Sequence, residues 1–338
     1  MPEIKKKQHY VPQFYLTQYS GKDRINGFDK ILKINQPNTA VKNLGHENYY
    51  YDLPDEFVQS VQNGTSNLDE LVKKHIYPTF EPNNFDKQFL ENYFSELEST
   101  IAPRFSSLIK KLDAQPHLLQ TSFDTIISDD EKEKIADFFA LQAIRVPSFR
   151  QLGEKVRPLL KKSLPPFLAS YIEATDFLDD NQRLFYHLAS GILTRLSLHF
   201  IENFHWQIAV IETPQESPIP HVAKSHVTAE FLLSDNPVVN IKNIPNNDIH
   251  RLSLEFALPL NSRYLLLLRE PNFPFGMPTN SVFEAIPNDV RIYNDYQLRF
   301  SSRKIFYNQS SSKAKLEKYF KLPSTYTHNA DKFAVVTG

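Results

Sequence analysis

Four places in the chain carry ionisable side chains where the surrounding pattern is apolar or aromatic. They hold His9, Glu98, Arg145 and Asp235. A histidine exchanges protons near neutral pH, carboxylates position water or a cation, and an arginine guanidinium binds phosphate through a rigid fork of donors. Phosphoryl transfer requires side chains of these kinds, so these residues are the candidate catalytic and substrate-binding groups.

His9 lies in a segment at residues 8–16 in which polar and aromatic side chains alternate. Chain termini are usually poorly ordered, so a segment of this composition indicates that something holds it in place. His9 is either a hydrogen-bonded structural residue in a docked strand or turn, or a catalytic histidine. Tyr10 and Gln13 belong to the same segment and are candidate substrate-binding residues.

Glu98 follows Leu97 and lies one helical turn from Phe94 and Ile101, near the rim of an apolar helical stripe. An unpaired carboxylate at such a rim is a solvated helix charge. A paired one is a candidate acid, base or metal ligand. The sequence leaves both interpretations open.

Arg145 is placed at the carboxyl end of an apolar helix, where the helix dipole favours a cation. It is therefore either a structural charge or an anion-binding residue. Arg150 follows five positions later, beyond Pro147, and is a second candidate for holding phosphate.

Asp235 and Asn236 precede Pro237 in a polar turn between two apolar runs. Side chains of these types bond their own backbone in turns, which alone explains their presence. A carboxylate that leaves the end of a buried strand is also how many active sites present an acid. Both residues are therefore candidate catalytic groups.

Three stretches of the chain must position these residues. Residues 1–60 form a short β segment, residues 66–206 a helical block, and residues 207–308 a β-rich part, followed by a polar C-terminal tail at 311–338. Strands, then helices, then strands predict an α+β fold in one domain over residues 1–310. In this fold the helical block packs on a mainly antiparallel sheet.

The helical block contains three recognisable helices. Apolar residues recur every three or four positions over residues 90–108, and Pro103 is expected to kink this helix. Ser128 and Glu131 have the spacing of a capping box, which predicts that a second helix begins there. A third helix is expected over residues 183–204.

The composition excludes several classes of function. Lysine plus arginine number 38 against 39 acidic residues, so no overall field favours DNA, RNA or an anionic membrane. The chain has no cysteine, which removes disulfides, thiolate metal sites and cysteine nucleophiles. Glycine occurs only 8 times, and neither a dinucleotide-binding nor a P-loop glycine motif is present.

The N-terminal seven residues are basic but lead into His9 without the apolar region of a signal peptide. No window reaches the length of apolar sequence that spans a membrane. The chain is therefore expected in the cytoplasm, with no membrane partner.

The motifs together resemble a known family. They are QHYVPQFYL at 8–16, ENYYY at 47–51, RVP at 145–147 with Arg150, SDNPV at 234–238, and PLNSR at 259–263. This combination is similar to the bacterial family called domain of unknown function 4238, over residues 5–308. Two departures are Asn261-Ser262 in place of the family's Ser-Pro, and Thr17-Gln18 in place of its usual Arg-Asn.

The resemblance implies grouping rather than chemistry, since the family has no established activity. It does imply that five residues correspond to family motif positions and are expected to meet in one place: His9, Glu98, Arg145, Asp235 and Asn236.

Two functions of different kinds follow. The first is a phosphodiesterase or nuclease-like hydrolase acting on nucleic acid or a nucleotide, expected as a bacterial defence or toxin effector. His9 would be its general acid or base and Arg145 would hold phosphate. Glu98 and Asp235 would position water or a cation such as Mg²⁺ or Mn²⁺. The alternative is a non-catalytic interaction module, in which the same side chains form a buried hydrogen-bonded network.

Overall fold

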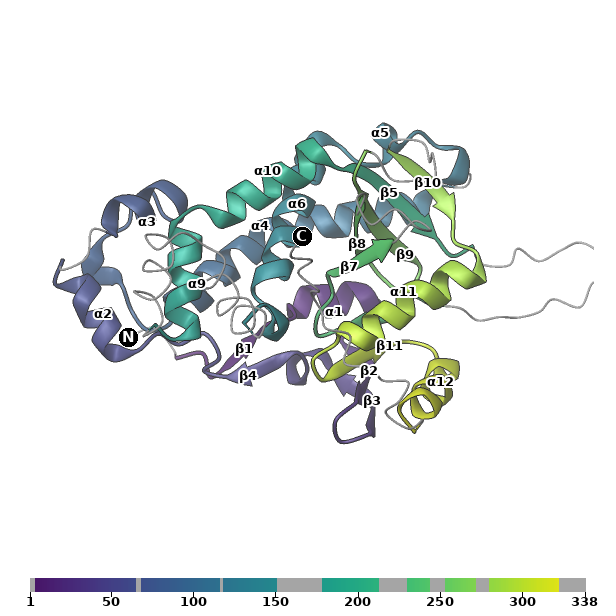
Figure 1. The fold of residues 1–338 in the computed structure, drawn as a ribbon, viewed down its shortest axis with the longest axis horizontal. Helices are drawn as coiled ribbons and strands as arrows, with labels where there is room; N and C mark the ends of the chain where they lie inside the picture. Colours follow the sequence, from purple (N-terminus) through teal and green to yellow (C-terminus); the bar gives the residue numbers. More distant parts are fainter. Residues whose placement is uncertain are drawn as a thin grey trace, which may run out of the picture.

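The computed structural model describes seven stretches of the chain: residues 4–64, 68–115, 118–150, 178–212, 230–243, 253–271 and 280–321. These residues form a mixed α+β fold with three mostly antiparallel sheets, which confirms the predicted fold class. Figure 1 shows the helices α2 (Asp55–Gln62), α3 (Asp69–His75) and α9 (Asp180–Ala189) at one end of the molecule, and the five-stranded sheet at the other end together with α11 (Pro287–Phe300) and α12 (Ser310–Lys321).

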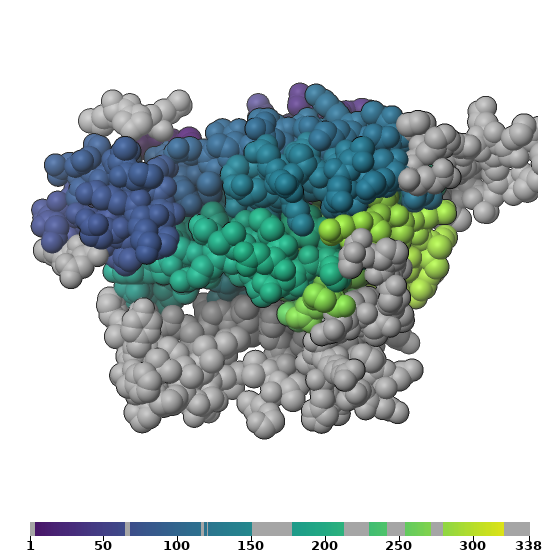
Figure 2. All heavy atoms as spheres, turned by 90° about the horizontal axis from the view of Figure 1, so that it is seen from above, coloured from purple at the N-terminus to yellow at the C-terminus, as the bar shows by residue number. Residues whose placement is uncertain are grey.

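The helical part is built around α4 (Phe89–Ala114), α6 (Asp129–Ile144) and α10 (Ile192–Asn203), with α6 packed against both of the others. Four shorter helices complete it: α2 (Asp55–Gln62), α3 (Asp69–His75), α5 (Phe123–Ile126) and α9 (Asp180–Ala189). Viewed from above, the atoms of residues 118–150 lie directly against those of 178–212 (Figure 2).

Helix α4 carries the predicted apolar stripe on its inner face. Leu90, Phe94, Ile101, Phe105 and Leu108 are all fully buried. The helix is assigned without interruption through Pro103, so the expected kink does not divide it. Helix α6 begins with the predicted capping box, in which the Ser128 and Glu131 side chains bond each other's backbone N–H.

The third predicted helix is two helices, because Gly191 ends the first and begins the second. Gly191 has φ +78°, a left-handed conformation that favours glycine. A Cβ at this position would lie 2.7 Å from His75 Nδ1, so the turn also needs a residue without a side chain.

The largest sheet has five strands in the order β10 (Ser281–Glu284), β5 (His205–Val210), β9 (Tyr264–Arg269), β8 (Ser253–Pro259) and β7 (Val239–Asn243). Only the β10–β5 pair is parallel. Alternate residues of β9 face opposite sides: Leu266 and Leu268 join the helical core, whereas Leu265 and Leu267 pack with α11 (Pro287–Phe300).

A second sheet has the order β3 (Ile34–Ala40), β2 (Arg24–Asp29), β11 (Lys304–Tyr307) and β6 (Leu233–Ser234). It joins the N-terminal hairpin to the C-terminal end of the fold. Helix α12 (Ser310–Lys321) follows it. The expected polar tail therefore begins with a helix: Leu316 is buried in an apolar cluster with Phe28 and Ile305, which holds α12 against this sheet.

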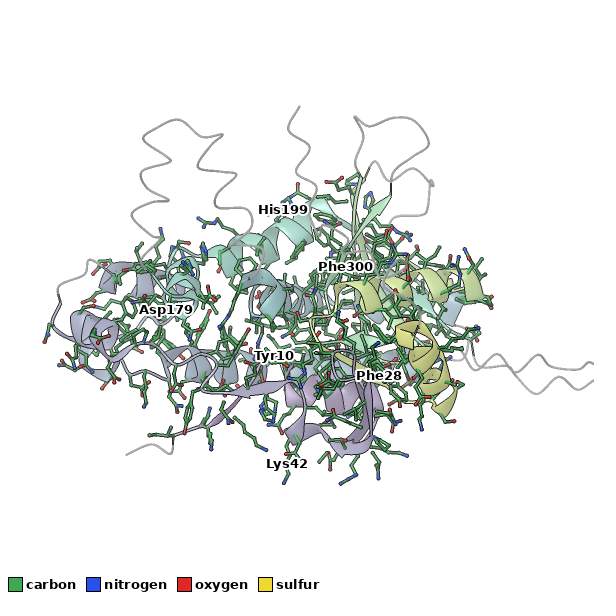
Figure 3. All side chains as sticks on the ribbon, turned by 60° about the horizontal axis from the view of Figure 1, so that its bottom comes forward. Tyr10, Phe28, Lys42, Asp179, His199 and Phe300 are labelled. Carbon is green, nitrogen blue, oxygen red and sulfur yellow. The ribbon has the colours of Figure 1, made fainter. Side chains whose placement is uncertain are left out.

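The third sheet is the short antiparallel pair β1 (Lys7–His9) and β4 (His46–Asn48). Helix α1 (Gln13–Ser20) follows β1 and enters the core through Tyr15, Leu16 and Tyr19. Figure 3 places Tyr10, between β1 and α1, well inside the molecule and Lys42 at its edge. The N-terminal segment thus lies between the helical part and the sheets, where four of the candidate residues, His9, Gln13, Glu98 and Arg145, come together.

Candidate functional site

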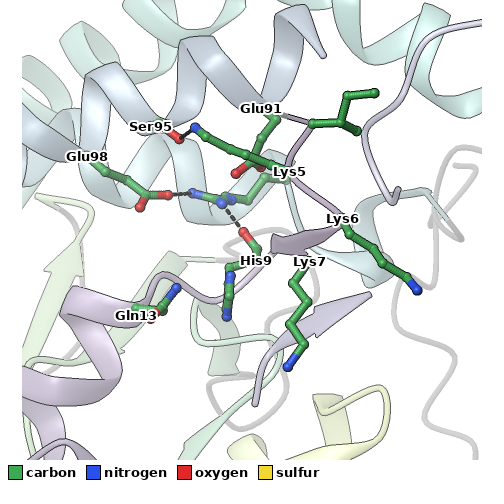
Figure 4. Close-up of a pocket in the computed structure, with 10 residues that line it drawn as sticks. Lys5, Lys6, Lys7, His9, Gln13, Glu91, Ser95 and Glu98 are labelled. Carbon is green, nitrogen blue, oxygen red and sulfur yellow. Dashed lines mark hydrogen bonds and ion pairs between the residues drawn. The ribbon is translucent and has the colours of Figure 1, made fainter. Parts of the chain in front are cut away.

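A cavity of about 550 Å³ lies where the N-terminal strand meets helix α4 (Figure 4). We call it the N-terminal pocket. Its wall consists of Ile4, Lys5, Lys6, Lys7, His9, Gln13, Glu91, Ser95, Glu98 and Arg145. Four of the eight site residues predicted from the sequence, His9, Gln13, Glu98 and Arg145, therefore line one cavity.

The Gln8 side chain fixes the strand that forms this wall. Gln8 is fully buried, and its amide oxygen accepts a hydrogen bond from the Tyr51 backbone N–H at 2.5 Å. Its amide nitrogen donates to Asp52 at 2.5 Å. The segment around His9 is therefore a docked strand, which explains the alternation of polar and aromatic residues in its sequence.

Arg145 caps the C-terminal end of α6 and is 1 % exposed. Its guanidinium donates to Glu98 Oε1 at 2.6 Å, to the His9 backbone oxygen, and to the Tyr51 hydroxyl at 3.3 Å. It also lies 5.0 Å from the centre of the Phe94 ring. Arg145 thus ties α6, α4 and β1 together, and each of its three nitrogens already has a partner.

Glu98 is the ion-pair partner of Arg145 in this wall. Its side chain is 22 % exposed, against 1 % for that of Arg145. The sequence left open whether this carboxylate is solvated or paired, and the structure shows it paired at the rim of the pocket.

Glu91 lies two helical turns before Glu98 on the same face of α4 and is 8 % exposed. Burial raises the pKa of Glu91 to about 7, and the charges of Glu98 and Asp52 act in the same direction, while Arg145 and Lys5 oppose them. No hydrogen bond to its carboxyl group occurs within the described residues. Glu91 is thus a buried pocket carboxyl that changes charge near neutral pH.

His9 contributes to the pocket in two ways. Its backbone oxygen accepts from Arg145, while its ring extends toward Gln13, away from Glu91 and Glu98 (Figure 4). Burial lowers the pKa of His9 to about 4, and the charges of His46 and Arg145 contribute to this lowering. The ring is therefore neutral at pH 7.

Three consecutive lysines bring positive charge to the pocket. Lys5 Nζ donates to Ser95 Oγ at 2.8 Å, and Lys7 Nζ donates to Asn43 Oδ1 at 2.8 Å. Lys6 points outward from the strand (Figure 4). Gln13 is exposed at the start of α1.

Tyr10 and Arg150, two predicted substrate-binding residues, do not line this pocket. Arg150 stacks on the Tyr50 ring at 3.8 Å and donates to the Tyr50 carbonyl at 3.1 Å and to Asn181 at 2.7 Å. The Tyr10 ring is 5 % exposed and lies 5.5 Å from that of Tyr50. Both form part of the packing behind the pocket wall.

Asp235 and Asn236 do not line the pocket either. Asp235 accepts hydrogen bonds from the backbone N–H groups of Ser302, Arg303 and Lys304 at 2.7, 2.6 and 2.8 Å. Asn236 donates to the Phe300 carbonyl at 3.1 Å. The turn between β6 and β7 thus holds the connection from α11 to β11.

The expectation that both residues meet His9, Glu98 and Arg145 in one cavity is not met. Burial raises the pKa of the Tyr10 phenol, and Asp235 lies close enough for its charge to act in the same direction.

The expected Mg²⁺ or Mn²⁺ role of Glu98 and Asp235 does not fit these contacts. Such cations need carboxylate oxygens that are free to coordinate. Glu98 Oε1 is bonded to Arg145, and both oxygens of Asp235 accept backbone N–H groups. Within the stretches that the structure describes, no three His, Asp or Glu side chains are grouped so that they could share an ion.

The sequence analysis did not identify Glu91, Ser95 and the three lysines at 5–7 as residues of the pocket wall. A signal for the first two was present, because positions 91, 95 and 98 are spaced by four and three residues and share one helix face. No sequence pattern places the lysines against α4, since that contact depends on the docking of β1.

No curated protein and no solved structure matches the chain. In the described part of the chain, no helix combines the length and apolar character needed to cross a membrane. The family model described as protein of unknown function (DUF4238) matches residues 7–311, so the chain belongs to the DUF4238 family.

Proposed function

We propose that the protein is a phosphodiesterase that cleaves a small phosphate diester, of the size of a nucleotide, in the N-terminal pocket. The observation that carries this proposal is Glu91, a buried carboxyl with a pKa of about 7 in a cavity that is also lined by lysines. Acid–base catalysis is most effective when the pKa of the catalytic group lies near the working pH.

The charge of the pocket favours an anionic ligand. Lys5, Lys6 and Lys7 line it, while Arg145 and Glu98 neutralise each other. Cations that surround a phosphoryl group stabilise the charge on its equatorial oxygens in the transition state.

The size of the pocket favours a small substrate over a polymer. A volume of about 550 Å³ lies within the usual range of roughly 300–1,000 Å³ for small-molecule sites. The net charge of the chain is −1, whereas binding of long nucleic acids normally needs an extended basic surface. Of the two substrate classes expected from the sequence, the nucleotide is therefore favoured.

In the proposed reaction the Glu91 carboxylate accepts a proton from a water molecule, whose oxygen attacks the phosphorus. The bond to the leaving oxygen breaks, and that oxygen takes a proton from solvent or a neighbouring lysine. Arg145 holds β1 against α4 through its hydrogen bonds to Glu98 and the His9 backbone oxygen. His9, with a pKa of about 4, is too weak a base for this step at pH 7.

The test is a hydrolysis assay on bis(p-nitrophenyl) phosphate and a panel of cyclic and linear dinucleotides. Glu91→Gln keeps the size of the side chain but removes its titration, and the rate is expected to fall by about 10²–10⁴-fold. Glu202→Gln, on the exposed face of α10, is the matched control and is expected to keep the wild-type rate. Equal rates for wild type and Glu91→Gln, or no hydrolysis of any substrate by the wild type, would contradict the proposal.

The second candidate is the non-catalytic interaction module. The bonded state of Arg145 favours it, because all three guanidinium nitrogens have partners in the fold. Under this alternative the nucleotides bind without being cleaved or do not bind. Isothermal titration calorimetry with the same panel, run beside the hydrolysis assay, distinguishes the two.

A further inference from the structure

Two histidines face each other across the β1–β4 ladder. The register of this antiparallel pair places His9 directly opposite His46. Directly opposed side chains on one face of an antiparallel pair lie close enough to act together. The centres of the two imidazole rings are 5.1 Å apart, and the ring planes are inclined by 59°.

Each ring has a buried nitrogen without a partner. His9 Nε2 and His46 Nδ1 form no hydrogen bond with any described residue, although the great majority of buried side-chain polar atoms in folded proteins have one. The His9 ring also has a hydrogen bond with the Lys42 backbone. A backbone hydrogen bond of this kind orients a metal-binding imidazole and fixes which nitrogen carries the proton.

We propose that His9 and His46 together bind one divalent transition-metal ion of the Zn²⁺, Ni²⁺ or Cu²⁺ type. An ion about 2.0–2.1 Å from one nitrogen of each ring lies roughly 3.2 Å from each ring centre. Centres 5.1 Å apart then subtend an angle of about 105° at the ion, near the tetrahedral value that zinc prefers. The distance between the ring centres thus suits a shared ion bound by one nitrogen of each ring.

The chemistry of the ligands selects the class of ion. Neutral imidazole suits Zn²⁺, Ni²⁺ and Cu²⁺, whereas Mg²⁺ and Mn²⁺ prefer oxygen. Burial lowers the pKa of both histidines, which keeps their lone pairs available at neutral pH. The charges of Arg145 and Lys7 oppose binding, but Arg145 is paired with Glu98 and the Lys7 ammonium group is bonded to Asn43.

The site is open rather than closed. It has two protein ligands, since no third His, Asp or Glu joins them in the described stretches. Water or an exogenous ligand would complete the coordination, as in sites that keep an exchangeable position. His9 also lines the N-terminal pocket, so the ion would border it. The inference stands independently of the proposed hydrolysis, because it concerns binding alone.

The experiment is a titration of the full-length, tag-free chain with ZnCl₂ in a calorimeter. The expected result is one ion per chain, with an affinity that falls by about tenfold or more in His46→Asn and in His9→Asn. His199→Asn is the matched control, because His199 is exposed on α10 and bonds only within its own helix among the described residues. Its affinity for Zn²⁺ is expected to equal that of the wild type.

Circular dichroism of each variant identifies any loss of fold. His46 is only half-buried, so His46→Asn decides the question if His9→Asn unfolds. Unchanged zinc affinity in folded His46→Asn, an equal loss in His199→Asn, or no binding by the wild type would overturn the proposal. The absorption spectrum of bound Co²⁺ gives a second readout, which changes in His46→Asn only if this imidazole is a ligand.

Discussion

Arg145 and Asp235 are both buried charges at 1 % exposure, but they belong to different kinds of region. Asp235 accepts three backbone N–H groups in the connection from α11 to β11, so its bonding is completed by the chain itself. Arg145 is also fully bonded, yet it forms one wall of a cavity. Beside it lies Glu91, whose carboxyl group has no partner within the described residues.

Burial and charge do not by themselves identify a functional residue. A buried charge completed by its own backbone stabilises a turn. A buried group left without a partner beside a cavity can act on a ligand. By this criterion Glu91 is the residue proposed to act on a ligand in the pocket, and the contacts of Arg145 and Asp235 are with the fold itself.

The largest effect on stability is expected at Asp235. Asp235→Ala removes the buried carboxylate that three backbone N–H groups donate to, and should lower the free energy of unfolding by about 3–5 kcal/mol. Urea denaturation followed by circular dichroism measures the free energy of unfolding of the variant and of the wild type. Asp235→Asn keeps one acceptor oxygen, so its loss of unfolding free energy should be roughly half that of Asp235→Ala. The activity of the pocket should be retained. A loss below about 1 kcal/mol in Asp235→Ala would mean that these hydrogen bonds do not hold the turn.

Arg145→Met should lower the free energy of unfolding by about 2–4 kcal/mol, because it leaves Glu98 and the His9 carbonyl without their donor. Glu98 is partly exposed, so water replaces some of the lost interaction. Arg299→Met is the matched control, since its ion pair with Asp295 is on the surface, and a change of about 0–1 kcal/mol is expected. Equal losses for the two arginines would remove the distinction between the buried and the surface pair.

Glu91 should make stability depend on pH. Its pKa is 4.5 when exposed and about 7 in the folded chain, so the folded state holds this proton more tightly. The stabilisation is complete below pH 4.5 and is lost as the pH rises through 7. Glu91→Gln cannot ionise and should therefore be more stable than the wild type at pH 8, by on the order of 2–3 kcal/mol, and about equal at pH 4.5.

Urea unfolding of both proteins at several pH values measures this difference. Glu202→Gln, at an exposed position, should follow the wild type throughout. A constant difference between wild type and Glu91→Gln across this range would show that Glu91 titrates as an exposed carboxyl group.

The smallest effect on the free energy of unfolding is expected at Arg150. Arg150→Met removes the stacking on Tyr50 and the bonds to the Tyr50 carbonyl and Asn181, at a cost of about 1–2 kcal/mol. The rate of phosphodiester hydrolysis should change little, because Arg150 does not line the pocket. A large loss of activity with little loss of stability would place Arg150 among the ligand-binding residues, as the sequence suggested.

The sequence predicted the helices of the core and the fold class well, because both follow from local periodicity. The stripe on α4 and the capping box of Ser128 and Glu131 are examples. The break at Gly191 was missed because the apolar pattern continues across it, while the close approach of His75 that requires glycine is a tertiary contact. Helix α12 was missed because its buried face is narrow and depends on Leu316.

The site was only partly accessible to the same reasoning. His9, Glu98 and Arg145 each interrupt an apolar or aromatic pattern, and the family resemblance implied that they meet, which the hydrogen bonds of Arg145 to the other two confirm. Asp235 interrupts such a pattern in the same way, and only the path of the α11–β11 connection shows that its partners are backbone groups. The pairing of His9 with His46 depends on strand register, which the sequence of two three-residue strands does not determine.

The most direct test of the account is the titration of the Glu91 carboxyl group by nuclear magnetic resonance. Glutamate labelled with ¹³C at the carboxyl carbon gives one signal per residue, and the signal absent from Glu91→Gln identifies Glu91. We expect a midpoint near pH 7, and a further upward shift when inorganic phosphate occupies the pocket, because a bound anion disfavours the carboxylate. A midpoint near 4.5 that phosphate does not move would contradict it.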